Sequence, residues 1–493
     1  MSSAELDMTT ITLLYGRHGM SERRIVVRGG HLVTMDPALG TIPQGDVLVE
    51  DGEITAVATS LPAVDAEVID ARGHIVAPGL IDTHRHTWQS QMRALCADWT
   101  LGDYFYGIRL AVSPAYTAED VYLGNRLGAL EALNAGVTTI LDFSHCNNSP
   151  DHSDAAIAGL QDAGNRAIFA YGFFDSSPQT PQFFADHGER IKDFQRIATR
   201  YFHGGGGLLR LGVALSEVGL IPLRSTRAEI QTARAHDALI VTHTGTVWSL
   251  PSGIAQLDAT GLLGPDQVHV HCNALTELEW DILARHRAKI SISPETELNM
   301  GMGRLAFRAA EQRGIKPTLS ADVTSLNSGD LFVQLRLGLA FKRWADAEPT
   351  NLARADPQHV STSAHQALEW TTINAAEALR LEDLIGSITV GKRADLILVG
   401  GSAINQHPQI DPAGTLVFQT CADDVRTVLV DGKVVKRDGV LLGLNLAELT
   451  KRADESARAI LERVRTRVPQ LPGTAPAAFE EVAGPVNANL GSG

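Results

Sequence analysis

The stretch IVAPGLIDTHRH, Ile75–His86, decides the fold expected of this chain. It begins as an apolar run of the kind that forms a strand buried on both faces. It ends in His84-Arg85-His86, and side chains two residues apart on a strand point to the same side. Both imidazoles therefore face one point at the C-terminal end of the strand, where they form a chelating pair for a divalent metal such as zinc. The stretch predicts a catalytic metal.

The chain beyond this stretch alternates strand and helix patterns. Strands are predicted at 75–84, 137–143, 166–173, 208–215, 238–243, 267–272, 288–293 and 316–322. Helical patterns lie between them, at 118–134, 183–201, 226–236 and 304–313. Strands and helices in this order predict an α/β fold, a (β/α)8 TIM barrel. The alternative is an open doubly wound sheet, but no GxGxxG motif follows the first strand to support it.

Both ends of the chain are rich in strand signals. Hairpin patterns turn at Asp51-Gly52 near one end and at Asp431-Gly432 near the other. We therefore expect the two termini to form one composite β-sandwich domain beside the barrel. The predicted organisation is a flexible extension at 1–23, a sandwich from 24–74 and 386–445, the barrel at 75–385, and a C-terminal helix with a flexible tail at 446–493.

Composition and charge restrict the possible partners. The 493 residues carry a formal net charge of −15, and an acidic surface opposes nucleic acid or an anionic membrane as the main partner. No apolar run approaches the roughly 20 residues that a membrane helix requires. The four cysteines are scattered and form no CxxC motif, which indicates reduced thiols and a cytoplasmic protein.

Metal-capable side chains recur at the ends of four predicted strands, and active sites of such barrels lie at the C-terminal ends of the strands. These residues are His84 and His86 on the first strand, His243 on the fifth, His271 on the sixth and Asp322 on the eighth. His269 is the alternative on the sixth strand. We favour His271, because its position is nearer the barrel mouth.

The motifs resemble those of the amidohydrolase superfamily, in its cytosine-deaminase and chlorohydrolase-like (ATZ/TRZ) branch. The resemblance is carried by PGLIDTHRH at 78–86, HCNALTELE at 271–279, SADVTS at 320–325 and TTINAAEALRLEDLIGSITVGKRADLILV at 371–399. It implies the barrel with its composite sandwich, and a homodimer or larger homo-oligomer that acts on a small molecule.

The same resemblance implies the metal ligands, which would be His84, His86, His243 and Asp322. Family members with two metals bridge them with a carboxylated lysine on strand four. The strand predicted here, LLRLGVAL at 208–215, has no lysine, so we expect one ion. Zn2+ is favoured, and Fe2+, Co2+ or Mn2+ also suit these ligands.

The expected chemistry is hydrolysis of a C–N bond through a metal-bound hydroxide, because a divalent ion lowers the pKa of bound water to about 7 in favourable sites. Asp322 would move the proton to the leaving group, and His271 would support the developing oxyanion. The expected bond is an amide, urea, carbamate or similar group. It belongs to a small cyclic or aromatic compound, uncharged or cationic.

One departure from the family pattern concerns the position three residues after His243. Deaminases of this branch usually carry a glutamate there, which protonates a ring nitrogen. This chain has Thr246, whose hydroxyl is far too weak an acid for that role. Deamination of an aminated heterocycle is therefore the alternative function. A catalytically silent scaffold is a second alternative, which the retained metal ligands oppose.

Further side chains near the predicted strand ends are candidates for substrate binding. They are Trp88, His145, Glu217, Thr246, Glu295 and Glu297. Glu295 or Glu297 would either replace the missing glutamate or bind a cationic part of the substrate, and Trp88 is the aromatic side chain expected to touch substrate. Each also has a plainer interpretation, as a core residue or a solvated loop carboxylate.

Overall fold

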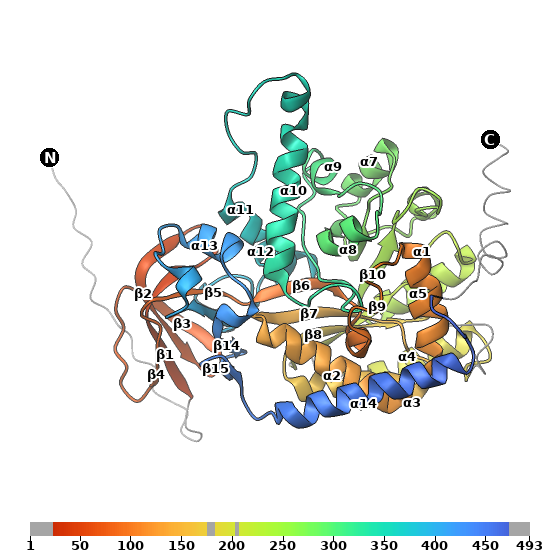
Figure 1. Ribbon diagram of the computed structural model, residues 1–493, viewed down its shortest axis with the longest axis horizontal. Coiled ribbons are helices and arrows are strands. Elements are labelled where there is room, and N and C mark those ends of the chain that lie inside the picture. The colour runs from red at the N-terminus through yellow and green to blue at the C-terminus, as the bar shows by residue number, and fades with distance from the viewer. Residues whose placement is uncertain (1–22, 175–182, 203–206, 473–493) are drawn as a thin grey trace.

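Two β-sheets organise the chain, a parallel barrel sheet and a separate sheet at the left of Figure 1. The computed structural model describes residues 23–174, 183–202 and 207–472. The predicted N-terminal extension, apart from residue 23, and the last part of the predicted tail lie outside these residues.

The barrel sheet has the order β6-β7-β8-β9-β10-β11-β12, so each strand lies beside the next one along the chain. Its members are β6 (Leu80–Arg85), β7 (Val137–Ser144), β8 (Arg166–Gly172), β9 (Leu209–Ala214), β10 (Leu239–Thr244), β11 (Gln267–His271) and β12 (Lys289–Ser291). The predicted eighth strand is reduced to single bridges, Ile292 with Leu319 and Arg85 with Asp322. These bridges close the ring, so the predicted (β/α)8 architecture is confirmed.

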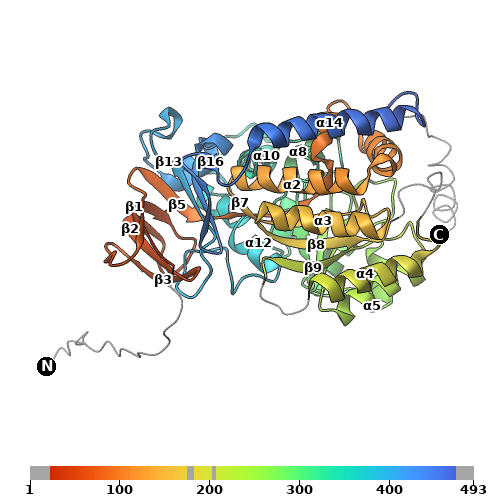
Figure 2. The ribbon, with the colours of Figure 1, turned by 90° about the horizontal axis from the view of Figure 1, so that it is seen from below.

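The helices of the described chain lie mostly around the barrel, while part of one of them projects away from it at the top of Figure 1 (Figures 1 and 2). They are α1 (Leu101–Tyr104), α2 (Ala118–Asn134), α3 (Pro150–Ala163), α4 (His187–Tyr201), α5 (Leu223–Ala235), α6 (Ile254–Ala259), α7 (Glu277–Arg285), α8 (Pro294–Asn299), α9 (Phe307–Glu311), α10 (Leu331–Leu352), α11 (Ala364–Glu369), α12 (Ile373–Ala378), α13 (Pro412–Phe418) and α14 (Leu446–Arg465). α14 lies along α2 in both views, and Arg463 pairs with Asp120 between them. The C-terminal helix thus braces the barrel from outside.

The second sheet combines both ends of the chain. Its order is β16-β15-β14-β13-β5-β1-β2-β3, and β4 also pairs with β1. The strands are β1 (Arg24–Val33), β2 (Thr41–Glu50), β3 (Glu53–Ala58), β4 (Glu67–Asp70), β5 (His74–Pro78), β13 (Leu396–Gly400), β14 (Val425–Val430), β15 (Lys433–Arg437) and β16 (Val440–Leu441). The predicted composite unit is therefore present as one continuous sheet around an apolar core that includes Val27, Val49 and Leu398.

The strand predicted at 75–84 is divided between the two sheets. β5 ends at Pro78 in the composite sheet, and β6 begins at Leu80 in the barrel. Gly79, between them, donates its N–H to the carbonyl of Asp395 at 2.8 Å. A Cβ at Gly79 would collide with the side chain of Thr138, so glycine is required at this crossing. The strand that carries two predicted metal ligands is thereby fastened to both units.

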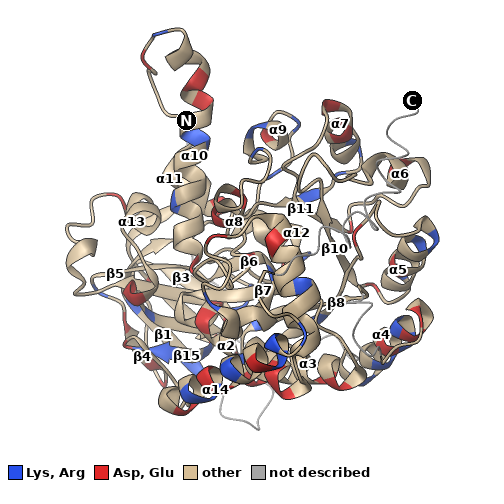
Figure 3. Cartoon of the chain, turned by 45° about the vertical axis from the view of Figure 1, so that its right-hand side comes forward, with Lys and Arg blue, Asp and Glu red and all other residues tan. Residues whose placement is uncertain are grey.

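Charged side chains gather on outer helices such as α4 and α14 (Figure 3), while the barrel strands are almost wholly apolar or buried. All four cysteines are free thiols, and of these only Cys421 is exposed. In the described part of the chain, no helix combines the length and the apolar character needed to cross a membrane.

Candidate metal centre and substrate cavity

Histidines and an aspartate converge at the C-terminal ends of the barrel strands. The potential ligand atoms of His84, His86 and His243 lie within 4.8 Å of one another, and so do those of His84, His271 and Asp322. The two groups share His84, so they form one cluster. The structure thus brings together every side chain that the sequence assigned to metal binding or proton transfer.

The backbone turns sharply where two of these residues sit. His271 has φ 74° and Asp322 has φ 60°, values that are uncommon for residues other than glycine. Strained backbone of this kind concentrates at functional sites. On the sixth strand His271 lines the cavity described below, while His269 is not part of its lining and lies 2.9 Å from the hydroxyl of Thr244.

The cluster has the electrostatic character of a zinc site. Burial lowers the pKa of His84 to about 4 and the pKa of His86 well below its usual value, so both rings are neutral at pH 7. Burial acts to raise the pKa of Asp322, but the surrounding histidines, His84 above all, together outweigh it and hold that pKa well below its usual range. The Oδ1 of Asp322 lies 3.1 Å from the Nε2 of His84 and 3.5 Å from the Nε2 of His86. Neutral imidazoles around an ionised carboxylate fit a divalent ion.

Ordinary core packing does not account for His84. The residue is fully buried, yet within the described structure its Nδ1 has no hydrogen-bond partner. A histidine that served only the core would have both ring nitrogens satisfied. The donor set therefore fits the metal that the sequence predicts.

Outer partners orient the rings of the cluster. The Nδ1 of His243 lies 3.1 Å from Oε1 of Glu217, and the Nδ1 of His271 lies 3.0 Å from Oε1 of Glu297. The Nδ1 of His86 faces the carbonyl of Phe143 at 3.2 Å. Partners at Nδ1 fix the tautomer and leave Nε2 for the cluster, as is usual for metal-binding histidines.

A cavity of about 390 Å³ opens beside the cluster, a size that suits a small molecule. Its lining includes seven predicted residues, His86, His145, Glu217, His243, Thr246, His271 and Asp322. Its apolar and aromatic walls include Leu101, Tyr104, Phe105, Leu220, Leu250, Met300 and Met302. One cationic side chain, Arg109, also lines it.

Three predicted substrate-binding residues lie outside this lining. Trp88 is buried and donates its Nε1–H to Nδ1 of His145 at 2.9 Å. Glu295 accepts a hydrogen bond from the side chain of Gln334 at 2.8 Å. Glu297 is the buried partner of His271. Trp88 and Glu297 contact histidines of the cavity lining, Glu295 does not, and none of the three forms its wall.

Sequence reasoning missed Arg109. It lies in a π-helical segment, Phe105–Val112, whose unusual winding no sequence pattern announces. The available signal was a lone basic residue in the aromatic stretch YFYGIR, in the long connection after the first barrel strand.

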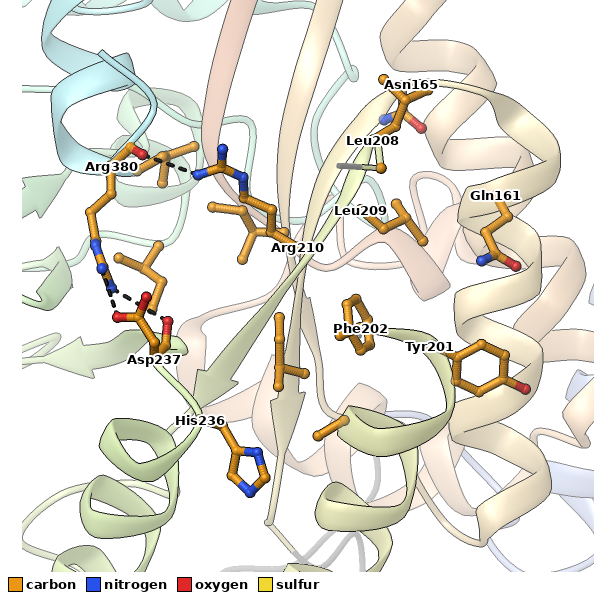
Figure 4. A pocket seen from close by; sticks show the side chains of 16 residues that line it. Gln161, Asn165, Tyr201, Phe202, Leu208, Leu209, Arg210, His236, Asp237 and Arg380 are labelled. Carbon is orange, nitrogen blue, oxygen red and sulfur yellow. Dashed lines mark hydrogen bonds and ion pairs between the residues drawn. The ribbon is translucent and has the colours of Figure 1, made fainter. Parts of the chain in front are cut away.

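A larger hollow of about 800 Å³ lies at the opposite end of the barrel strands (Figure 4). Residues at the start of β9 and just before β8 and β10 line it, including Arg210 and Asp237. Arg380 binds Asp237 at 2.7 Å and accepts a hydrogen bond from Arg210 at its carbonyl, at 3.2 Å. Active sites of such barrels lie at the other face, so we place the chemistry in the cavity beside the histidine cluster.

Sequence relatives cover nearly the whole chain. A 5'-deoxyadenosine deaminase of Methanosarcina mazei is 26% identical over 459 residues, which are 90% of this chain and 99% of that protein. A 5-methylthioadenosine/S-adenosylhomocysteine deaminase of Desulforudis audaxviator is 28% identical over 466 residues, 90% of this chain and 100% of that protein.

Solved structures share the fold. An adenosine deaminase from Xanthomonas campestris with bound zinc superposes with a TM-score of 0.77 at 23% identity, over 90% of this chain and 98% of that one. The atrazine chlorohydrolase TrzN from Arthrobacter aurescens TC1, complexed with zinc, gives 0.76 at 22% identity, over 88% and 100%. The model of the amidohydrolase family matches residues 75–435, as the resemblance of the motifs predicts. This chain therefore belongs to the amidohydrolase family.

Proposed function

We propose that the protein is a metal-dependent hydrolase that cleaves an amide, urea, carbamate or similar C–N bond of a small cyclic or aromatic compound. The observation that carries the proposal is the convergence of His84, His86, His243 and Asp322 beside the cavity. These residues would hold one ion, preferably Zn2+. When bound, a divalent ion acidifies water and polarises a carbonyl oxygen.

Asp322 and His271 supply the proton chemistry. Asp322 is ionised and lines the cavity, so it can accept a proton from the attacking water and return it to the leaving nitrogen. Burial acts to lower the pKa of His271, but its hydrogen bond to Glu297 and the charges of Asp322, Glu297 and Glu217 together outweigh burial and raise that pKa. His271 is therefore suited to donate a hydrogen bond to the oxygen on which negative charge develops.

The acidic side chains near the cavity favour hydrolysis of an amide-like bond over deamination of an aminated heterocycle. Thr246 lines the cavity where deaminases of this branch usually carry a glutamate. Burial acts to raise the pKa of Glu217, but its interactions with His243, Arg109 and His271 together outweigh burial and lower that pKa. Glu217 is thus an ionised acceptor for His243, and it is not an acid that could protonate a ring nitrogen.

A second candidate is deamination of an aminated heterocycle. The relatives named as deaminases, which match this chain over about nine-tenths of its length, favour it. Product analysis separates the two. Stoichiometric free ammonia from an aminoheterocycle would support deamination, a carboxylate with an amine would support amide hydrolysis, and carbon dioxide with an amine would support urea or carbamate hydrolysis.

The first test is the metal content of protein purified without chelators, measured by elemental analysis beside a His84→Ala/His86→Ala variant. The proposal expects about one ion per chain, lost in the variant, and hydrolysis of a member of an amide, urea and carbamate library. Two ions per chain would contradict the single site. No ion after incubation with zinc, iron, cobalt or manganese would favour a silent scaffold.

We further propose that the protein is cytoplasmic and forms a homodimer or larger homo-oligomer. Its four free thiols support a reducing compartment. Light scattering coupled to size-exclusion chromatography tests the assembly, and a single-chain mass would contradict it. Cell fractionation tests the compartment.

A further inference from the structure

We propose that Arg109 forms an anion-binding subsite of the cavity and that the substrate carries a carboxylate group. This inference rests on the proposed function and names the substrate class of the same site. It revises the expectation of an uncharged or cationic substrate.

Arg109 is a buried cation with no ion-pair partner among the described residues, and the charge of Glu217 acts on it only from beyond ion-pairing distance. Only 4% of its surface is exposed, and it lines the cavity. Its Nη1–H donates to the carbonyl of His145 at 3.0 Å, and its guanidinium lies 5.0 Å from the ring of Phe174. No carboxylate among the described residues forms an ion pair with it. Buried charges are otherwise paired, because an isolated one loses its hydration without gaining a partner.

Two other buried arginines of this chain, Arg85 and Arg166, follow the usual rule. Arg85 pairs with Asp82 at 2.8 Å, and Arg166 pairs with Asp395 at 3.1 Å. Burial lowers the pKa of Arg109, which reflects the cost of holding this charge away from water. A negative group on a ligand would remove that cost.

The carboxylates that line the cavity already have histidine partners. Asp322 faces His84 and His86, and Glu217 faces His243. Their two negative charges match one divalent ion at the cluster. Glu217 also acts on Arg109 through space, but neither carboxylate contacts the guanidinium, so its free N–H groups favour an anion in the cavity.

Two further donors line the cavity. Trp88 donates to Nδ1 of His145, so the proton of that ring lies on Nε2 and is available to a ligand. The Tyr104 hydroxyl accepts from Gln89 at 2.7 Å, which leaves its own hydrogen to donate. A carboxylate is an acceptor only, and charge-assisted bonds from a guanidinium fork are its strongest partners.

The subsite adjoins the reaction centre. The ring of His145 stacks on that of His86 with centroids 4.1 Å apart, and its backbone carbonyl holds Arg109. The π-helical segment Phe105–Val112 carries Arg109, and such windings are rare and frequently functional. A carboxylate bound here would hold a small ring beside the metal ligands.

Calorimetric binding of benzoate, benzamide and phenyl phosphate to the full chain, both zinc-free and zinc-loaded, tests the inference. Arg109→Gln should weaken benzoate binding at least tenfold in both forms and change benzamide binding less than twofold. Arg343→Gln is the matched control. That arginine also donates to a carbonyl, of Thr362, and lies over an aromatic ring, of Phe418, but it is not part of the cavity lining. If Arg109→Gln does not fold, Arg109→Lys should serve instead. It keeps the positive charge but lacks the planar guanidinium, so it should still weaken benzoate binding at least threefold.

Equal affinity of the wild type and Arg109→Gln for benzoate would overturn the inference. So would benzoate binding that depends on zinc and not on Arg109. Phenyl phosphate bound tenfold more tightly than benzoate, through Arg109, would overturn the carboxylate class. Failure of the proposed function is distinguishable from both. It would appear as no zinc or no hydrolysis, while Arg109-dependent benzoate binding persisted in the zinc-free chain.

Discussion

The imidazole of His271 is held by a buried carboxylate, with its Nδ1 3.0 Å from Oε1 of Glu297. The same oxygen accepts the backbone N–H of Ser293 at 2.8 Å, and the other oxygen accepts the side-chain amide of Asn273 at 2.9 Å. Glu297 is therefore fixed before any ligand arrives. It positions His271 and raises the pKa of that ring against the opposing effect of burial.

Glu297→Gln should lower the pKa of His271, because it removes the negative charge beside the ring. If protonated His271 donates to the substrate oxygen, activity falls above this pKa, so the alkaline fall of kcat/KM should move to lower pH. We expect a loss of about tenfold at pH 8, with zinc content unchanged. Glu295→Gln is the control, since Glu295 lies outside the cavity lining. A pH profile that does not move would refute the role given to Glu297.

Asp322→Asn should reduce kcat by about 10² to 10⁴, the usual range for loss of a general acid–base group. Single-turnover hydrolysis of the substrate found by screening measures the effect, with zinc content determined on the same sample. Asp281→Asn, on the exposed side of α7, should retain full activity. Unchanged activity of Asp322→Asn would show that the proposed proton transfer is wrong.

Thr246→Glu should restore the carboxyl group that deaminases of this branch carry three residues after the fifth-strand histidine. Because Thr246 lines the cavity, the new side chain would reach a bound ring. We expect ammonia release from an aminoheterocycle at least tenfold above that of the wild type, in a coupled glutamate dehydrogenase assay. Thr246→Gln, which has the same shape without the acid, should not show this gain.

Zinc should stay bound at mildly acidic pH. Burial lowers the pKa of His84 to about 4 and that of His86 well below its usual value, so neither ring takes up a proton at pH 6. Protons compete with the metal only as pH falls from about 5 towards 4. Dialysis against buffers from pH 8 to pH 4, followed by elemental analysis, should show constant occupancy down to pH 6. Release already complete at pH 6 would indicate histidines with ordinary pKa values.

Arg166→Leu should destabilise the protein by about 3–5 kcal/mol, because Asp395 would remain buried without its partner. The pair is 5% and 2% exposed and joins the barrel to the composite sheet. Arg234→Leu, which breaks the more exposed pair with Asp266, should cost less than about 1 kcal/mol. Urea unfolding followed by circular dichroism measures both, and equal effects would contradict the distinction.

Elements with local signals could be predicted from the sequence. The helix α2 has its predicted bounds because Thr117 and Asp120 form a capping box at its start. The hairpin at Asp51-Gly52 forms because both residues take positive φ, 49° and 84°, as that type of turn requires. The division of the first strand at Gly79 could not be foreseen, because it depends on a contact with Thr138, distant in sequence.

The candidate site could also be predicted from the sequence only in part. Residues at strand ends, such as His84 and Asp322, could be found because barrel geometry brings those ends together. The roles of Glu297 and Trp88 could not be predicted from the sequence, because each contacts a histidine ring whose orientation is defined only in the folded chain. Arg109 was missed for a related reason, because its place depends on the winding of a π-helical segment.

Because the chain crosses from one sheet to the other at Gly79, the order in which the strands are synthesised affects when the metal ion can bind. His84 and His86 leave the ribosome early, but β5, just before them, pairs with β13 along one edge, and β13 is made after the whole barrel. Asp322 also lies far downstream. Until β13 is made, β5, which leads directly into the strand that carries His84, lacks one of its two neighbours. The ion should enter when the last strands dock, as a late closing event, and not as a nucleus around which the chain folds.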